Sequence, residues 1–384
     1  MLNNYKRIEK VVLTLLFLYF ALKPIYIFKS GMPQIADFCL VFVFLLLITH
    51  KKTYTVNKEQ ITKINKIIKC FYPFLIWIVI ISFFWTLILS KFSLMKPILF
   101  YLFNLMSIYI IKELYFIYNK EIIYKITKYV SLSCIIQFIL SLIFYAGSGR
   151  ATVLFNNPNQ LGFYALLCCT YIISLEDYSN KKMFFVSLLS SVYLVLISLS
   201  KAAIIGSFGL LFVYFVFKLK NKVLKFLMVI ILFFIFLLGY DRVIYNSLNN
   251  VPLFHSVIYK IENMNNENDS SLSTGRGYDR LKEIGIEIIY GVGEGDFYRF
   301  STLSGYEIHS GYASIICYYG LIGFILLLYF VFKLLSNNPK FYLLLFGVFL
   351  YGFTHQIWRN TFLWILLFIM CVYNKKNGDY DERY

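Results

Sequence analysis

The feature that most constrains this chain is a series of apolar runs, most of them long enough to cross a lipid bilayer as a helix. A spanning helix needs about 17 to 25 predominantly apolar residues. Twelve such runs begin near Val11, Ile35, Cys70, Pro97, Tyr129, Leu161, Met183, Ala202, Phe226, Gly311, Phe341 and Thr361. They are continuously apolar and do not alternate with period two, which favours helices over a β-barrel. The sequence therefore predicts an all-α, polytopic membrane protein of about twelve transmembrane helices over residues 1–384. Because the runs near Pro97, Leu161 and Phe341 are short, eleven is the alternative.

Composition supports the membrane class and indicates an orientation. Hydrophobic residues make up 59% of the chain, compared with roughly 45 to 50% in ordinary soluble domains. If the amino terminus is cytoplasmic, most of the 37 lysines and arginines fall on the cytoplasmic side, so both termini are expected there. Lysines beside anionic headgroups account for most of the formal charge of +17. We expect membrane lipids and no nucleic acid as partners, since no nucleic-acid-binding signature accompanies the charge.

The connections between apolar runs are called joints here, and those predicted on the non-cytoplasmic side are outer joints. The first unusual outer joint is "GRATVLFNNPNQLG", which lies between two strongly hydrophobic runs. Asn159 can cap a helix that starts at Leu161, because its side chain can accept a hydrogen bond from a first-turn amide. Arg150 beside the apolar core is costly unless its charge is paired, solvated or used. Arg150 and Asn159 are therefore candidate substrate-binding residues.

The second joint, "ISLSKAAIIGS", leaves only Ser200 and Lys201 between two hydrophobic helices. Lys201 can extend to the membrane interface, as lysines at helix ends commonly do. Since it shares the outer face with Arg150, an anion-binding role is equally consistent with its position.

The third joint is a long hydrophilic loop, residues 240–307. Within it, apolar residues recur at helical spacing over Tyr278–Ile288, which predicts an amphipathic helix along the membrane surface. Ser273 or Thr274 can cap the start of that helix, and Gly291 can end it.

The same loop ends near a histidine. "GVGEGDF" is expected to be a flexible turn, and a lone Gly-x-Gly-x-Gly that follows no strand is a weak phosphate signal. His309 then stands at the start of the next span. Two competing histidines are expected on the same face, His255 in the long loop and His355. His355 lies in "THQIWRN" with Trp358 and Arg359, which we interpret as an aromatic and basic membrane-interface anchor.

Five segments in this order resemble a known family: "GRATVLFNNPNQLGFYALL", "SLSKAAIIGSFGLL", "GRGYDRL", "YGVGEGDF" and "HSGYASIICYYGLIGFILLL". The order and topology resemble the O-antigen ligase and Wzy-type polysaccharide polymerase superfamily over about Gly149 to Phe330. The resemblance implies a GT-C-like membrane glycosyltransferase on the outer face of the cytoplasmic membrane. Such enzymes use glycans carried on undecaprenyl pyrophosphate and need neither metal nor cofactor.

The resemblance also implies roles for particular residues. Arg150 and Arg276 match arginines that hold the lipid pyrophosphate, and His309 matches the catalytic histidine. Two positions depart from the family pattern. Lys201 stands where arginine is usual, which weakens bidentate phosphate binding, and Ser310 stands where asparagine is common, which puts the orientation of His309 in doubt.

Glycosyl transfer requires charge stabilisation on the leaving pyrophosphate and deprotonation of the incoming hydroxyl. Arg150 and Arg276, with Lys201 or Arg280, can supply the positive charge. His309 can act as the base, because an unperturbed histidine pKa of about 6.5 lies near neutrality.

We therefore expect a polysaccharide polymerase that transfers a lipid-linked glycan to another lipid-linked repeat unit of O-antigen or capsule. Expected partners are that lipid-linked oligosaccharide, a chain-length regulator and a flippase. One alternative is a ligase that transfers the glycan to a lipid A core. Others are a flippase or transporter, which would carry ionisable residues along its spans, and a structural subunit.

Overall fold

The computed structural model describes residues 2–29, 31–49, 53–145, 149–220, 277–296 and 307–373. Within these residues the secondary structure is entirely helical. Six helical segments are long and apolar enough to cross a membrane, namely Lys58–Leu89, Phe92–Tyr118, Lys120–Phe144, Lys181–Ser198, Lys201–Lys218 and Gly311–Leu335. The expectation of an all-helical, multi-pass membrane protein is thus confirmed for the described part of the chain, while the count of twelve spans and the orientation stay predictions.

The helices follow the apolar runs of the sequence. The amino-terminal half contains α1 (Leu2–Leu22), α2 (Ile35–Thr49), α3 (Lys58–Lys69), α4 (Tyr72–Leu89), α5 (Lys96–Tyr118), α6 (Lys120–Phe144) and α7 (Pro158–Ser174). The remainder contains α8 (Lys181–Ser198), α9 (Lys201–Lys218), α14 (Arg280–Glu283), α15 (Gly311–Leu335), α16 (Lys340–Leu344), α17 (Phe346–Gly352) and α18 (Thr361–Val372). Short 3₁₀ turns cover Phe92–Met95, Glu176–Tyr178 and Ile286–Ile288.

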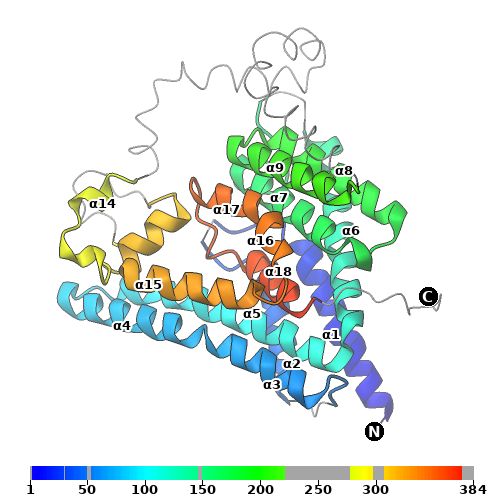
Figure 1. Ribbon diagram of the computed structural model, residues 1–384, viewed down its shortest axis with the longest axis horizontal. Helices are drawn as coiled ribbons and strands as arrows, with labels where there is room; N and C mark the ends of the chain where they lie inside the picture. Colours follow the sequence, from blue (N-terminus) through cyan, green and yellow to red (C-terminus); the bar gives the residue numbers. More distant parts are fainter. Residues whose placement is uncertain are drawn as a thin grey trace.

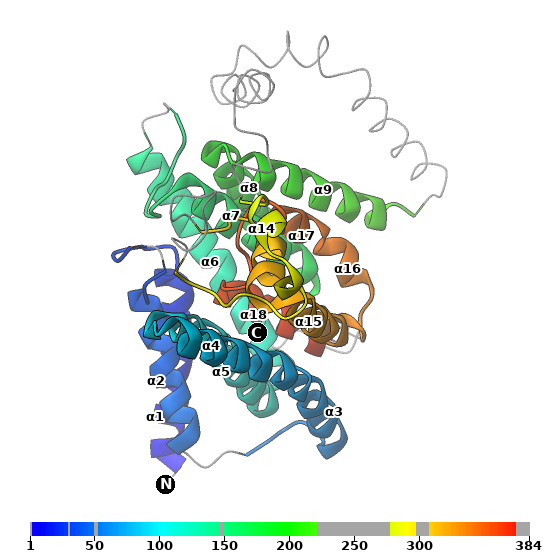
Figure 2. The same cartoon turned by 90° about the vertical axis from the view of Figure 1, so that its left-hand side faces the viewer.

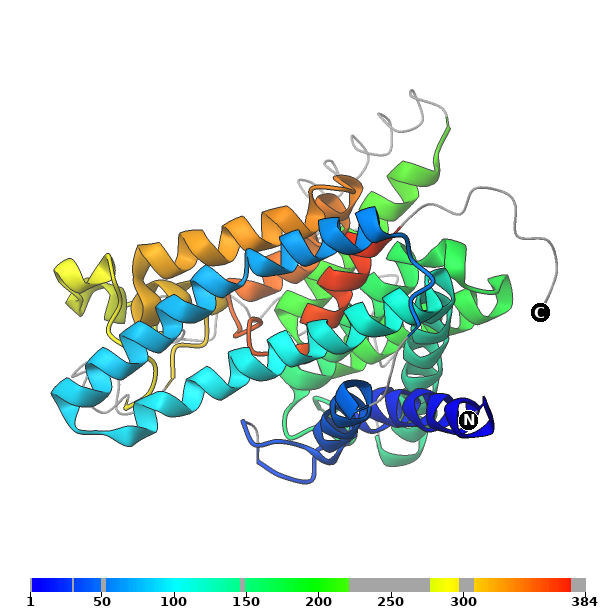
Figure 3. The ribbon, with the colours of Figure 1, turned by 90° about the horizontal axis from the view of Figure 1, so that it is seen from below.

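Three of the long helices, α4, α5 and α15, run side by side (Figures 1 and 3). In both views α14 lies beyond one end of this layer, and the start of α1 lies toward the opposite end. Figure 2 shows α1 packed along α2, with α9 on the far side of the molecule next to α8 and α17. The bundle therefore has two distinct ends, one of which carries α14.

Helix α18 forms the centre of the bundle, in contact with α5, α7 and α15. All twelve of its residues are buried, as expected for a helix that is apolar on every face. Trp364 in its first turn donates a hydrogen bond from Nε1 to the carbonyl of Trp358 (2.6 Å). At about 1.5 Å per residue, α18 is only about 18 Å long, and its start at Thr361 is therefore held deep inside the protein.

Three details differ from the sequence-based expectations. Asn157, not Asn159, caps α7 by accepting from the amide of Gln160 (2.9 Å), because Pro158 occupies the first helical position. The run near Pro97 is a 23-residue helix and is not short. The run near Phe341 forms two short helices, α16 and α17, which adjoin at Leu345. The run near Phe226 lies outside the described residues.

The predicted surface helix over Tyr278–Ile288 is wrong as a continuous helix. The chain forms the single turn α14, leaves helical geometry at Ile284, and makes a 3₁₀ turn over Ile286–Ile288. Gly285 lies between the two turns, where a glycine disfavours a continuing helix. Gly291, the predicted end, has a φ of 96° and follows the 3₁₀ turn. Ser273 and Thr274, the two candidates for the start cap, and the rest of the loop up to Arg276 lie outside the described residues.

Helix α15 is interrupted at Gly320, where φ is 71°. The interruption would leave backbone groups without helical partners, which is costly inside a membrane protein. The segment after α14 supplies partners: the amides of Val292 and Gly293 donate to the carbonyls of Cys317 (3.0 Å) and Tyr318 (2.9 Å). The "GVGEG" turn, expected to be flexible, is thus docked against the break in α15.

Helices α9 and α17 cross at a contact between two glycines. A Cβ atom at Gly347 would lie 2.2 Å from the carbonyl oxygen of Gly206. We expect Gly347→Ala to lower the free energy of unfolding by about 1 to 3 kcal/mol, because the backbones must separate. The matched control is Gly209→Ala on α9, where a Cβ meets nothing within 4 Å. Thermal unfolding in detergent measures both variants, and equal midpoints would contradict the prediction.

Candidate functional site

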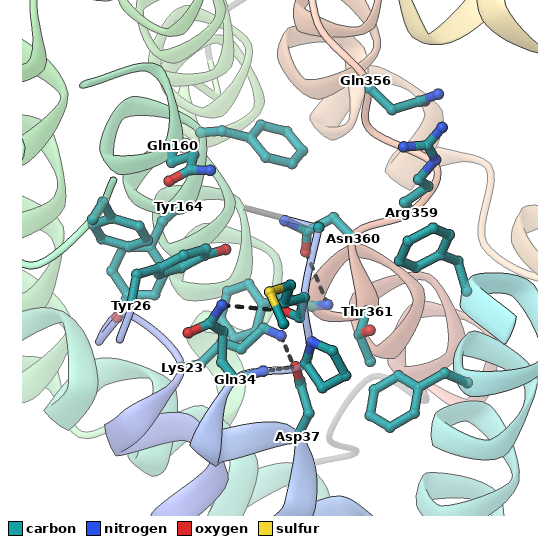
Figure 4. Close-up of a pocket in the computed structure, with 18 of the residues that line it drawn as sticks. Lys23, Tyr26, Gln34, Asp37, Gln160, Tyr164, Gln356, Arg359, Asn360 and Thr361 are labelled. Atoms are coloured by element: carbon teal, nitrogen blue, oxygen red, sulfur yellow. Dashed lines mark hydrogen bonds and ion pairs between the residues drawn. The ribbon is translucent and has the colours of Figure 1, made fainter. Parts of the chain in front are cut away.

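A pocket of about 670 Å³ opens among the helices, a volume within the range of about 300 to 1,000 Å³ that is usual for ligand sites. Its walls come from the α1–α2 connection, the amino-terminal parts of α5 and α7, the segment before α15, and the α17–α18 connection (Figure 4). Its polar and charged lining residues are Lys23, Gln34, Asp37, Lys96, Asn157, Asn159, Gln160, Glu307, His309, His355, Gln356, Arg359, Asn360 and Thr361. The pocket thus combines amide, charged and aromatic side chains.

Five helices begin at this pocket: α2, α5, α7, α15 and α18. The lining residues at or beside their starts are Gln34, Lys96, Asn159, His309 and Asn360. Each helix start carries roughly half a positive charge from the aligned peptide dipoles. Several helix starts around one cavity therefore favour a bound anion such as a phosphate group.

His309 is exposed and lines the pocket. The next residue, Ser310, caps α15, because its Oγ accepts from the amide of Ala313 (3.2 Å). The hydroxyl of Tyr278 donates to the same Oγ (2.8 Å). These contacts fix the backbone beside the histidine although serine replaces the asparagine common in the resembled family.

Arg150 reaches the pocket only through Asn159. Its Nη2 donates to Oδ1 of Asn159 (2.5 Å), and its Nε donates to the carbonyl of Ser198 (3.3 Å). Ser198 ends α8 and Lys201 begins α9, so the two predicted outer joints lie side by side. Asn159 lines the pocket, whereas Arg150 and Lys201 do not.

Of the other two predicted cations, Arg280 belongs to the described residues and does not line the pocket. Arg280 is completely buried within α14, and its charge acts on the neighbouring carboxylate of Glu307. Arg276 lies outside the described residues, so its predicted convergence with Arg150 on one diphosphate stays a prediction.

The interpretation of "THQIWRN" as an interface anchor is wrong. Trp358 is fully buried, and the Arg359 side chain is 19% exposed. Arg359 forms ion pairs with Glu294 and with Glu307 (2.5 Å). Glu294 is 1% exposed and also accepts a hydrogen bond from the hydroxyl of Tyr319 (2.5 Å). The acidic residue of the "GVGEG" turn therefore holds an arginine of the pocket wall.

Glu307 is a further titratable group in the pocket that sequence reasoning did not select. Burial raises the pKa of its carboxyl group to about 7, against the opposing effect of the Arg280 charge. The ion pair with Arg359 favours the charged form of the carboxylate and also opposes this rise. Its position two residues before His309 was the only signal in the sequence.

His355 also lines the pocket, stacked on Tyr351 with ring centroids 4.3 Å apart. Its Nδ1 lies 2.9 Å from the hydroxyl of Thr354. The hydroxyl of Tyr351 donates to the carbonyl of Asn159 (2.9 Å). His355 thus belongs to a packed aromatic group that supports the start of α7.

Comparisons with known proteins identify no relative: no family model matches the chain, and no curated protein sequence is significantly similar to it. Among the residues that the structure describes, no three or more His, Cys, Asp or Glu side chains are grouped to hold a metal ion. The functional argument therefore depends on the pocket itself.

Proposed function

We propose that this protein is a polysaccharide polymerase that transfers a glycan from undecaprenyl pyrophosphate to a sugar hydroxyl of another lipid-linked repeat unit. One observation carries the proposal: an exposed histidine, His309, lines a pocket around which five helices begin. This arrangement supports the two requirements of the reaction, a base for the incoming hydroxyl and positive potential for the leaving diphosphate.

The roles of the residues follow from the chemistry. The acceptor hydroxyl oxygen forms a bond to the anomeric carbon of the donor sugar while the bond from that carbon to the pyrophosphate oxygen breaks. The hydroxyl proton passes to a ring nitrogen of His309, and the bonding electrons leave with undecaprenyl pyrophosphate. The negative charge on that leaving group is stabilised by the helix starts, by Arg276 and Lys201, and by Arg150, which acts by way of Asn159.

The proposed setting is the cytoplasmic membrane, with both termini in the cytoplasm and the pocket on the outer face. This orientation follows the distribution of lysine and arginine, and it puts the pocket on the side where a flippase would present its product. A flippase and a chain-length regulator are accordingly the proposed protein partners.

The test is to incubate purified protein, without divalent metal, with the lipid-linked repeat unit that accumulates in cells lacking this chain. A ladder of longer lipid-linked products is the expected result. Transfer only to an added lipid A core would indicate the ligase, and movement of the repeat unit across vesicles without new linkages would indicate a flippase. Either of those outcomes would contradict the polymerase.

Lys201 allows a smaller test of the proposed anion binding. We expect Lys201→Arg to keep the wild-type KM for the lipid-linked donor, because a cation remains beside Arg150. Lys201→Ala is expected to raise that KM by about threefold, because Lys201 does not line the pocket and acts on the anion as a charge at a distance. Initial rates at varied donor concentration give the donor KM of each protein. Identical kinetics for all three proteins would show that Lys201 only contacts the membrane interface.

A further inference from the structure

The wall formed by the α1–α2 connection carries a second polar cluster. Lys23 and Asp37 both line the pocket, and their side chains are each 13% exposed. Lys23 Nζ lies 2.7 Å from Oδ1 of Asp37. Figure 4 places this pair and Gln34 away from the side of the pocket that carries Arg359 and Gln356. The cluster therefore lies on a different part of the pocket wall from Arg359 and Gln356.

This wall is rigidly built. Oδ2 of Asp37 accepts a hydrogen bond from the amide of Gln34 (2.9 Å). The side chain of Gln34 makes four further hydrogen bonds, all to the backbone of the α1–α2 connection. The connection is in turn tied to the segment before α7, since the amide of Tyr26 donates to the carbonyl of Leu154 (2.9 Å). A surface held in this way loses little conformational entropy when it binds a ligand.

The ion pair has the hydrogen-bonding capacity to bind hydroxyl groups. An ammonium group has three donors and a carboxylate has about four acceptor positions. The pair itself uses one donor and one acceptor position, and the amide of Gln34 uses another acceptor position. Adjacent sugar hydroxyls can donate to the carboxylate and accept from the ammonium group. The pair has no net charge, and Asp37 already occupies the start of α2, since it lies in the first turn and accepts from the amide of Gln34. The diphosphate is therefore favoured by the starts of the other four helices and not by this wall.

Aromatic rings continue the same wall. Tyr26 and Phe155 have ring centroids 5.3 Å apart, and Phe155 and Tyr164 have centroids 5.4 Å apart. All three residues line the pocket. The faces of aromatic rings carry partial negative charge, and the C–H face of a pyranose ring carries partial positive charge. A row of aromatic rings beside a hydroxyl-binding pair therefore suits an uncharged sugar ring.

We infer that the Lys23–Asp37 pair and the Tyr26–Phe155–Tyr164 row form the subsite for an uncharged pyranose of the acceptor glycan. The inference rests on the proposed function, because it assigns the acceptor side of the same pocket. It also gives a function to the position of the pair in the pocket wall. An ion pair that only joined α1 to α2 would not have to line the pocket.

The experiment uses full-length protein in detergent and the double variant Lys23→Met/Asp37→Leu, which removes both charges and leaves neither unpaired. The probe is the oligosaccharide released by mild acid from the accumulated lipid-linked repeat unit. Its binding is measured calorimetrically, and its KM as acceptor is measured with the donor saturating. The double variant is expected to weaken binding and raise the acceptor KM by about tenfold or more, while kcat and the donor KM change little.

The control is Lys218→Met/Glu176→Leu, an ion pair of 2.6 Å that does not line the pocket. It should leave oligosaccharide binding unchanged. Tyr26→Leu provides a second test that keeps both charges, and it should also raise the acceptor KM. Unchanged oligosaccharide binding in both pocket variants would overturn the subsite, as would equal losses of kcat and thermal stability without a change in KM.

These outcomes separate the subsite from the proposed function. A wild-type ladder with unchanged acceptor binding in the variants overturns the subsite and leaves the polymerase intact. Specific oligosaccharide binding that depends on the pair, without any ladder from the wild-type protein, supports the subsite and overturns the polymerase.

Discussion

His309→Ala is expected to abolish the ladder of lipid-linked products. A positioned general base contributes about 10²- to 10⁴-fold to a rate, and no other group in the proposed mechanism removes the acceptor proton. Because His309 is exposed, the substitution should leave the thermal unfolding midpoint and the protein yield unchanged. The measurement is the initial rate of product formation at matched protein concentration. Arg276→Ala should reduce the ladder nearly as far, and undiminished ladders in both variants would remove the assignment.

The pH dependence of the rate distinguishes His309 from its neighbour Glu307. A histidine base acts in its neutral form, so the rate should rise with pH as the imidazole loses its proton. Burial raises the pKa of Glu307 to about 7, and a carboxylate base would give a similar rise. Glu307→Gln separates the two, because the variant should keep the rise in rate if His309 is the base. Loss of both the activity and the rise in Glu307→Gln would instead assign the proton transfer to the carboxylate.

Glu294→Ala is expected to destabilise the protein by on the order of 3 kcal/mol. The substitution leaves Arg359 without its most buried partner, and removing one member of a buried ion pair costs about that much. Glu294 is itself 1% exposed, so the substitution also removes a buried side chain. Thermal unfolding of the purified protein measures the effect.

The matched control for this prediction is Glu283→Ala, at an exposed carboxylate on α14. It should shift the unfolding midpoint little. The double variant Glu294→Ala/Arg359→Ala should be less destabilised than the sum of the single variants, because the two side chains interact directly. A midpoint for Glu294→Ala equal to that of the control would show that the ion pair contributes nothing to stability.

The sequence predicted those features of the fold that depend on local apolar pattern. Runs near Tyr129, Met183 and Gly311 became helices because an uninterrupted apolar segment has few other ways to satisfy its backbone in a membrane. The predicted ends of helices were less accurate where a single residue determines where a helix begins or stops. Pro158 moved the cap of α7 back to Asn157, and Gly285 divided the expected surface helix.

The candidate site was only partly accessible to the same reasoning. His309 and Asn159 were selected from their neighbours in the chain, and both line the pocket. Arg359 was misinterpreted because its partner Glu294 lies 65 positions earlier in the chain. A one-dimensional pattern does not show which distant charges meet, so an arginine next to a tryptophan had the same appearance as a membrane anchor. Lys23 was overlooked for the same reason, since its position suggested only the flank of a helix.

The short central helix α18 has a consequence for any molecule that uses the pocket. The hydrocarbon layer of a bilayer is about 30 Å thick, whereas α18 extends only about 18 Å from the end where the Tyr373 hydroxyl meets Asp177. Asn360, at the other end, lines the pocket. The start of a helix too short to cross the bilayer therefore forms part of the pocket wall. If the protein acts as proposed, the diphosphate of the donor meets this helix start inside the bundle while its lipid tail stays in the membrane.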